Sequence, residues 1–179
     1  MKMLLLSSSV YGHVNTICET MRPCLAAGGF EVVEATFSDE TPDPKGFDAV
    51  LIGASIRNGK HNPAVISFIE RHLESLSQRP SGFFSVNLVA RKPHKNTPET
   101  NPYVRKFLEN SLWQPDRVGV FGGQLNYRRY RPMDRWVIRF IMWMNKGPTD
   151  LDTNADFTDW KAVKSFAEDF ARFAREQQQ

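Results

Sequence analysis

The chain has 179 residues, of which 41% are hydrophobic and 24% are charged, and its net charge is +3. This composition is typical of a folded globular protein with a full core, and it excludes a disordered or collagen-like chain. No apolar run approaches the roughly 18 residues that a membrane-spanning helix needs. A strand-like segment begins at Lys2, and Cys18 and Cys24 are the chain's two cysteines. We therefore expect one cytoplasmic domain over residues 1–179, without a signal peptide or a metal site.

Short apolar runs alternate along the chain with segments of helical period. The runs predict buried strands, because a parallel strand that is covered on both faces reads as a continuous apolar stretch. Strands are predicted over residues 3–6, 31–36, 48–52, 83–89 and 117–121, and helices over residues 14–27, 63–76, 100–110 and 158–174. Helices between consecutive strands indicate βαβ units. We predict an α/β, flavodoxin-like, doubly wound sheet of five parallel strands with helices on both faces, and a ligand at the carboxyl ends of the strands.

The loop after the first predicted strand is typical of a phosphate site. Unpaired N–H groups and the positive end of the helix dipole attract an anion at a helix start, and a glycine allows the backbone a close approach. The loop lacks the spacing of ATP and dinucleotide motifs, so the monophosphate of flavin mononucleotide (FMN) fits better. A plain serine-rich helix cap is the alternative. The predicted phosphate residues are Ser8, Ser9, Val10, Tyr11, Gly12, His13 and Val14.

Two further loops leave strand ends where a flavin ring would lie. Their small residues and amides are suited to pack on the ring and to bond its edge. The predicted contacts are Ala54, Ser55, Ile56, Arg57, Asn58 and Gly59 after the third strand, and Ser85, Val86, Asn87, Leu88, Val89 and Ala90 at the fourth. Arg57 either stabilises reduced flavin or is a solvated loop charge. No side chain stands out as a general base, and His13 is expected to act as a backbone donor more than as a base.

Residues 122–157 are too many for a simple strand-to-helix connection, so we interpret them as a functional insertion. Between residues 125 and 147, six cations stand against one anion, Asp134, which gives this segment a net charge of +5 and leaves −2 for the rest of the chain. Apolar spacing over residues 133–144 predicts a helix with one broad apolar face. Asp134, Arg135 and Arg139 are expected to face away from it. Such a helix is either a membrane-surface anchor or a core helix with solvated arginines, and we favour the anchor.

In the loops described above and in the insertion, the sequence resembles the flavodoxin-type, quinone-dependent protoporphyrinogen oxidases. The resemblance runs from Lys2 to about Phe173. Four stretches carry it: residues 52–57 (Ile-Gly-Ala-Ser-Ile-Arg), residues 84–93, which end in Asn-Leu-Val-Ala-Arg-Lys-Pro, residues 97–101 (Thr-Pro-Glu-Thr-Asn), and Tyr130-Arg131 with Asp134-Arg135. The second stretch is far more specific than the phosphate loop. Two positions depart from the family pattern: Val14 replaces a phosphate-binding threonine, and Asn58 replaces an aromatic residue near the flavin.

The resemblance implies FMN as cofactor and the dehydrogenation of protoporphyrinogen IX to protoporphyrin IX in haem biosynthesis, in three two-electron steps, with menaquinone or ubiquinone as acceptor. With the basic insertion, it predicts peripheral contact with the anionic inner face of the cell membrane. The flavin loops are expected to lie outside the insertion. The residues expected to serve the substrate or the membrane are Arg91, Lys92, Tyr127, Arg128, Arg129, Tyr130, Arg131, Arg135, Trp136 and Phe140. An electron carrier, an NAD(P)H:quinone reductase and a non-enzymatic membrane module are the alternatives. Nucleic acid is not an expected partner, and homo-oligomerisation is left open.

Overall fold

A parallel sheet forms the centre of the computed structural model, which describes residues 1–178. Its strands are β1 (Lys2–Ser8), β2 (Glu31–Thr36), β3 (Ala49–Ser55), β4 (Ser81–Val86) and β5 (Arg117–Phe121), in the order β2-β1-β3-β4-β5. The apolar strands β1, β3 and β4 are buried along almost their whole length, whereas β2 lies at an edge and alternates in exposure. This strand order is that of the flavodoxin-like doubly wound sheet, so the predicted fold class is confirmed.

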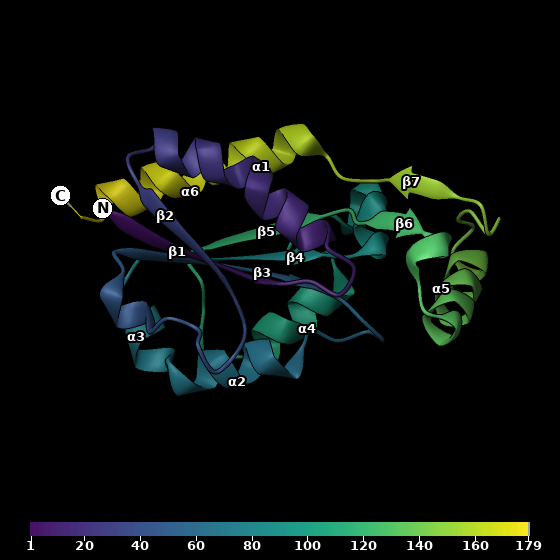
Figure 1. Cartoon of the computed structure of the whole chain (residues 1–179), viewed down its shortest axis with the longest axis horizontal. Coiled ribbons are helices and arrows are strands. Elements are labelled where there is room, and N and C mark those ends of the chain that lie inside the picture. The colour runs from purple at the N-terminus through teal and green to yellow at the C-terminus, as the bar shows by residue number, and fades with distance from the viewer. Residues whose placement is uncertain (179) are drawn as a thin grey trace.

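Helices cover both faces of the sheet (Figure 1). α1 (His13–Ala27) and α6 (Trp160–Glu176) pack together on one face, and α2 (Pro63–Arg71), α3 (Leu73–Ser77) and α4 (Pro102–Asn110) lie on the other. Each face has its own apolar core, and the neighbouring residues Phe83 and Phe84 belong to different ones. This follows from strand geometry, because successive side chains point to opposite faces.

Two of the differences from the predicted boundaries have a cause in a single residue. The helix predicted over residues 63–76 is two helices, which break at His72, where φ is −111° and ψ is 20°. The ring of His72 packs against Phe68 with a centroid distance of 4.6 Å. The strand predicted to reach residue 89 ends at Val86, because the side-chain oxygen of Asn87 accepts the Ala90 N–H at 3.1 Å and starts the 3-10 helix η2 (Leu88–Arg91). A side chain that bonds nearby backbone in this way competes with the strand ladder.

The insertion folds into a small unit with a core of its own. β6 (Gln124–Asn126) pairs antiparallel with β7 (Asn154–Asp156), and between them lie the 3-10 helix η4 (Tyr127–Arg129) and α5 (Pro132–Met144). Leu125, Tyr127, Tyr130 and Met142 form its buried cluster. The predicted helix is therefore present as α5, which Figure 1 shows at the right-hand end of the sheet. Within residues 1–178, no helix has the length and apolar character needed to cross a bilayer.

Candidate active site at the carboxyl ends of the strands

A cavity lies where β1, β3 and β4 end, and the inner side of α5 covers it. The predicted cofactor residues that line it are Ser9, Val10, Tyr11, His13, Val14, Ser55, Ile56, Arg57, Asn58, Gly59, Val86, Asn87, Leu88 and Val89. Three loops that are far apart in the sequence thus meet beside the first strand. This is the topological switch point, where sheets of this order bind their ligands.

Five of the predicted cofactor residues do not line the cavity: Ser8, Gly12, Ala54, Ser85 and Ala90. Four of them are buried behind its wall. The Ser8 hydroxyl accepts a hydrogen bond from Asn62 Nδ2 at 3.2 Å, and Ser85 Oγ lies 2.9 Å from His61 Nε2. These side chains support the wall, and alternation along the strands turns them away from the cavity.

Gly12, the fifth, shapes the phosphate loop through its backbone. It is the N-cap residue of α1, with a φ of 87° that glycine adopts without strain, and it has no side chain to cap the helix. The Ser9 hydroxyl accepts the Val14 N–H at 3.2 Å. The first turn of α1 therefore presents N–H groups and the positive end of the helix dipole to the cavity.

The His13 ring is engaged in a contact with the end of the insertion. Its Nε2 lies 2.6 Å from Thr158 Oγ1 and 3.6 Å from the Asp156 carboxylate. Burial lowers the pKa of His13, and the charge of Arg129 adds to this effect against the opposing charge of Asp156. The ring thus ties α1 to the segment before α6, which leaves the backbone N–H as its group in the phosphate loop.

Asp134 of α5, which the sequence predicted to face away from the apolar side of the helix, lies at the centre of the site. Only 7% of it is exposed. Its carboxylate accepts the Tyr11 hydroxyl, and Arg57 Nη2 donates to its two oxygens at 2.9 and 3.2 Å. One carboxylate therefore joins the phosphate loop, the loop after β3 and the first turn of α5. The helix is turned so that Asp134, Ile138 and Met142, spaced four residues apart, form its inner side.

The ionisation of this cluster follows from its hydrogen bonds. The Tyr11 hydrogen bond is the largest influence that lowers the pKa of Asp134, and Arg57 adds to it, while burial opposes both. Burial raises the pKa of Tyr11, and its hydrogen bond to Asp134 raises it further. Asp134 is therefore a carboxylate and Tyr11 a neutral donor at neutral pH.

Several cavity residues were not predicted as site residues. They are Tyr103, Gly123, Gln124, Asn126, Asp134, Val137, Ile138 and Ile141. All except Tyr103 belong to the insertion, so the cavity is shared between the three flavin loops, which lie outside the insertion as predicted, and the insertion itself. The apolar spacing of α5 showed that it has a face to bury, but spacing does not show against what that face packs.

Two buried asparagines hold the loop after β4 in shape. Asn101 donates from Nδ2 to Asn87 Oδ1 at 3.0 Å and to the Lys95 carbonyl at 2.9 Å. Its own side-chain oxygen accepts the N–H groups of Tyr103 and Val104, which caps α4. The Thr-Pro-Glu-Thr-Asn stretch therefore fixes the position of Asn87 at the cavity.

Half of the ten residues predicted for the substrate or membrane are engaged elsewhere. Arg91 Nη2 and Lys92 Nζ each donate at 3.0 Å to Asn145, at the end of α5. Tyr127 is fully buried, and its hydroxyl donates to the Pro148 carbonyl at 2.7 Å, so the prediction that it serves the substrate or the membrane is wrong. Arg128 is exposed and forms an ion pair with Asp152 at 2.8 Å, and the half-buried Arg135 donates to the Tyr130 carbonyl. Arg131 is exposed and lies outside the cavity, whereas Arg129 and Tyr130 line it.

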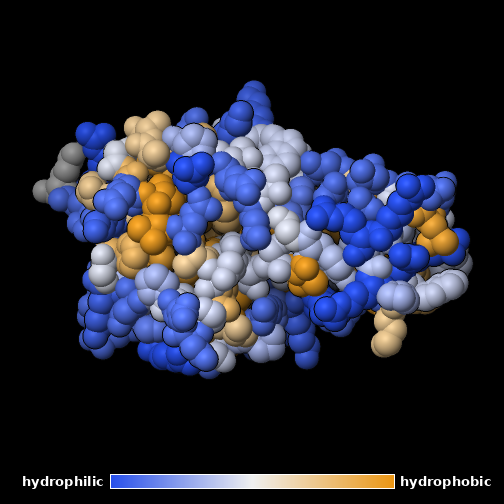
Figure 2. Space-filling model, viewed as in Figure 1, coloured by the Kyte–Doolittle hydropathy of each residue, from blue (hydrophilic) through white to orange (hydrophobic). Residues whose placement is uncertain are grey.

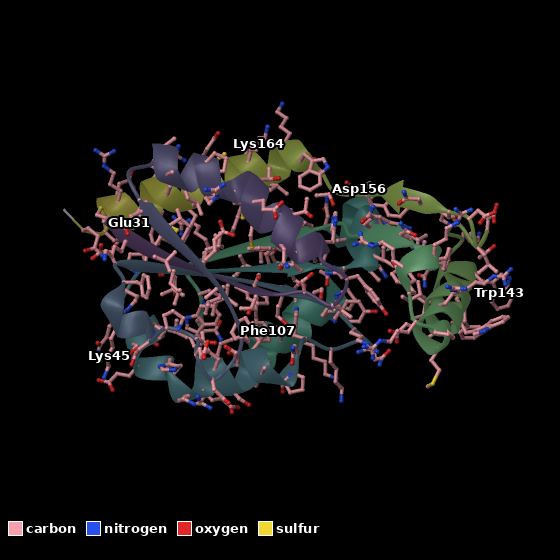
Figure 3. All side chains as sticks on the ribbon, viewed as in Figure 1. Glu31, Lys45, Phe107, Trp143, Asp156 and Lys164 are labelled. Carbon is pink, nitrogen blue, oxygen red and sulfur yellow. The ribbon has the colours of Figure 1, made fainter. Side chains whose placement is uncertain are left out.

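The outer side of α5 is apolar and exposed. The exposed fraction is 67% for Trp136, 59% for Phe140 and 68% for Trp143, and Met133 and Met144 are exposed beside them. Figure 3 shows Trp143 at the outer tip of the insertion, away from the sheet. Hydrophilic residues, blue in Figure 2, cover most of the face of the insertion seen in that view. The helix therefore does not bury its apolar face in the core of this chain.

Comparison with known proteins places the chain in a family. A family model for the flavodoxin domain matches residues 4–152. Protoporphyrinogen IX dehydrogenase (quinone) of Escherichia coli (strain K12) is 44% identical over 172 residues, which are 96% of this chain and 95% of that protein. The chain belongs to the flavodoxin-type protoporphyrinogen IX dehydrogenase family.

A second family member, from Leishmania major and of the same name, is also 44% identical, over 95% of this chain and 74% of its own length. Among solved structures, oxidised Flavodoxin 1 from Bacillus cereus has a TM-score of 0.56 at 13% identity and covers 96% of this chain and 98% of its own. A flavodoxin from the domain Archaea has a TM-score of 0.54 at 13% identity over 98% and 99% of the two chains. At such low identity these structures show the fold alone.

The cofactor of this family's flavodoxin domain is FMN, and the cavity fits it. The α1 start offers N–H donors to a phosphate, and the loops after β3 and β4 present small and apolar residues to a ring. The structure shows what surrounds the two positions that depart from the family pattern, Val14 and Asn58. Val14, in the first turn of α1, is fully buried and offers the cavity an apolar side chain in place of a hydroxyl, and Tyr103 brings an aromatic ring beside Gly59, next to Asn58.

Proposed function

We propose that this chain oxidises protoporphyrinogen IX to protoporphyrin IX and passes the electrons to a respiratory quinone, in haem biosynthesis. The observation that carries the proposal is the 44% identity, over 96% of the chain, to an enzyme with this name. The overall reaction removes six electrons and six protons, which reduce three quinones to three quinols. When bound, FMN supplies the chemistry that accepts two electrons at a time.

The chain's own residues bind and enclose the cofactor in this proposal. The N–H groups of residues 9–13 hold the phosphate, and residues 55–59 and 86–89 flank the ring. Asp134 holds α5 over the cavity through Tyr11 and Arg57. With α5 in place, Val137, Ile138 and Ile141 give the cavity an apolar wall that excludes water.

Arg57 is assigned a positioning role. The sequence left open whether its charge stabilises reduced flavin or is merely solvated. Its guanidinium lies 2.9 Å from the Asp134 carboxylate, and a pair of opposite charges has a much weaker field at a distance than a free cation. We therefore propose that Arg57 serves chiefly to hold α5.

The substrate is a large apolar macrocycle with two propionates, so its site needs an apolar wall and a cation. The inner residues of α5 supply the wall. Of the predicted arginines, Arg131 at the start of α5 is exposed and takes part in no ion pair among residues 1–178. We propose Arg131 as the partner of a propionate.

The exposed apolar side of α5 is proposed to rest on the anionic inner face of the cell membrane. Aromatic and methionine side chains with neighbouring cations are the composition of a helix that lies in the lipid interface. Arg131 and Lys146 flank the helix and are exposed. This arrangement brings the cavity close to the bilayer, where the quinone is dissolved.

Anaerobic mixing of the FMN-loaded protein with protoporphyrinogen IX tests the function. The flavin absorbance band should bleach, and added quinone should restore it as the porphyrin band appears. A flavin that the porphyrinogen leaves oxidised would contradict the proposal and favour an electron carrier. Bleaching by NADPH alone would instead indicate a quinone reductase.

A further inference from the structure

Arg129 of the insertion lies over the phosphate loop. It is the last residue of η4, and its side chain lines the cavity together with Ser9, Tyr11 and His13. A Cβ atom built on Gly12 would lie 3.9 Å from Arg129 Nη2, closer than to any other side chain outside the loop. The guanidinium therefore faces the bare backbone where α1 begins.

The charge of Arg129 is free to act at that point. Two neighbouring arginines have carboxylate partners, since Arg57 pairs with Asp134 and Arg128 with Asp152. Within residues 1–178, Arg129 lies within 4 Å of no carboxylate. Burial is the largest cause of the lowered pKa of His13, and the charge of Arg129 lowers this pKa further, so the field of Arg129 reaches the loop.

A cation beside the start of α1 would strengthen the binding of a phosphate there. Residues 7–16 contain no lysine or arginine, so the loop itself offers N–H groups, hydroxyls and a helix dipole but no full positive charge. A guanidinium presents paired donors that match the oxygens of a phosphate, and charge-assisted hydrogen bonds are stronger than neutral ones.

We propose that Arg129 is a cofactor-binding residue, whose guanidinium pairs with the phosphate of FMN held at the start of α1. The sequence had assigned this residue to the substrate or the membrane. The proposal rests on FMN as the cofactor, and it makes the insertion part of the cofactor site. It follows that the chain distinguishes FMN from riboflavin, which has no phosphate, partly through a residue outside the flavodoxin loops.

The test compares two ligands in three variants. Apo-protein is titrated with FMN and with riboflavin, and flavin fluorescence reports the affinity. Arg129→Gln should weaken FMN binding about tenfold to a hundredfold, the value of one charge-assisted hydrogen bond, and leave riboflavin binding within about twofold. Arg129→Lys should fall between, since lysine keeps the charge but not the fork. Arg128→Gln is the matched control, because Arg128 is in the same turn but lies outside the cavity.

Salt gives a second measurement. The FMN affinity of the native chain should decrease more steeply with ionic strength than that of Arg129→Gln, because added salt screens the ion pair. Equal weakening of FMN and riboflavin in Arg129→Gln would overturn the proposal, because the residue would then act on the fold. Unchanged FMN affinity would overturn it as well. Either result is separable from the proposed function, since the FMN-saturated variant can still be mixed with protoporphyrinogen IX.

Discussion

At the scale of single residues, the site depends on a few polar side chains whose partners lie far away in the sequence. Asp134 is the main example, with Arg57 77 residues away and Tyr11 123 residues away. The buried asparagines of the loop after β4 are another. Each replaces water with fixed donors or acceptors, and removal of one partner leaves the other with an unmet hydrogen bond.

The first residue-scale prediction concerns the Asp134 carboxylate. Asp134→Asn keeps the size of the side chain but removes its charge and replaces one of its two acceptor oxygens by an NH2 group, so Arg57 and Tyr11 lose a charged acceptor that both share. We expect the free energy of unfolding in urea at pH 7 to fall by about 1–3 kcal/mol. Asp152→Asn, which breaks the exposed pair with Arg128, should cost less than about 1 kcal/mol. Equal losses in the two variants would show that the Asp134 cluster does not hold α5.

This prediction has a pH dependence. The pKa of Asp134 is lowered in the folded chain, so its contribution is complete above the ordinary pKa of about 4 and is lost as the pH falls below that value. Between pH 5 and pH 3, which bracket a pKa of about 4, the free energy of unfolding should therefore change less in Asp134→Asn than in the native chain.

The second residue-scale prediction concerns His61, which is buried beside Phe83 and Phe107 and bonded to Ser85. Burial lowers its pKa to about 4. Because the unfolded chain binds this proton near pH 6.5, stability should fall as the pH drops from about 6.5 toward 4. His61→Gln should reduce this part of the pH dependence in urea titrations, and His94→Gln, at an exposed position, should not. A native-like pH profile in His61→Gln would assign the acid sensitivity to other groups.

At the scale of elements, α5 has two sides with different roles. Its inner side closes the cavity, and its outer side presents Trp136, Phe140 and Trp143 to the surroundings. A helix of a protein in water normally buries the wider apolar side. In α5 the wider apolar side is exposed instead. The Asp134 cluster stabilises this orientation, which suits a helix that contacts lipid.

The element-scale prediction is that α5 drives vesicle binding. Changing both Trp136 and Phe140 to Ser should reduce co-sedimentation with anionic phospholipid vesicles severalfold and leave the thermal midpoint unchanged, because both side chains are exposed. Leu112→Ser is the control, since Leu112 is 84% exposed but lies outside the insertion. Native-like binding by the double variant would mean that another surface meets the membrane.

At the scale of the whole molecule, the chain consists of a sheet unit and an insertion that meet at the cavity. The strands β1 to β5 pair with one another and with no part of residues 122–157. The cavity, in contrast, takes lining residues from both parts. The fold can therefore tolerate the loss of the insertion better than the site can.

The whole-molecule prediction concerns a variant with a short glycine–serine loop in place of residues 125–147. Its five-stranded sheet should stay folded, but its binding of FMN should be weaker. We expect a cooperative thermal transition and native-like far-UV circular dichroism, with an affinity for FMN at least about tenfold lower, the value of one lost charge-assisted hydrogen bond. Calorimetric titration measures the affinity. A native affinity in the folded deletion variant would show that the flavin loops bind FMN without the insertion, as the sequence had predicted.

The sequence by itself determined the elements and the chemistry of the loops. Alternating apolar runs and helical segments predicted the five parallel strands, and the loop at the start of α1 was recognised from residues 8–14. The errors at His72 and Asn87 were local, because both residues leave regular structure through side-chain contacts that periodicity does not encode. The family, too, was recognisable from residues 84–93.

Only the tertiary structure decided which way α5 faces and what its charges contact. Helical spacing shows which residues share a side, but not which side meets the rest of the chain. That choice depends on Tyr11 and Arg57, which the fold brings to Asp134 from two other loops. In the same way, the sequence does not separate Arg129 from the other five cations of residues 125–147. Its position over Gly12 in the structure distinguishes it from them. Pairing between distant residues is a property of the folded chain, because the packing of the sheet and the insertion sets which side chains come within reach.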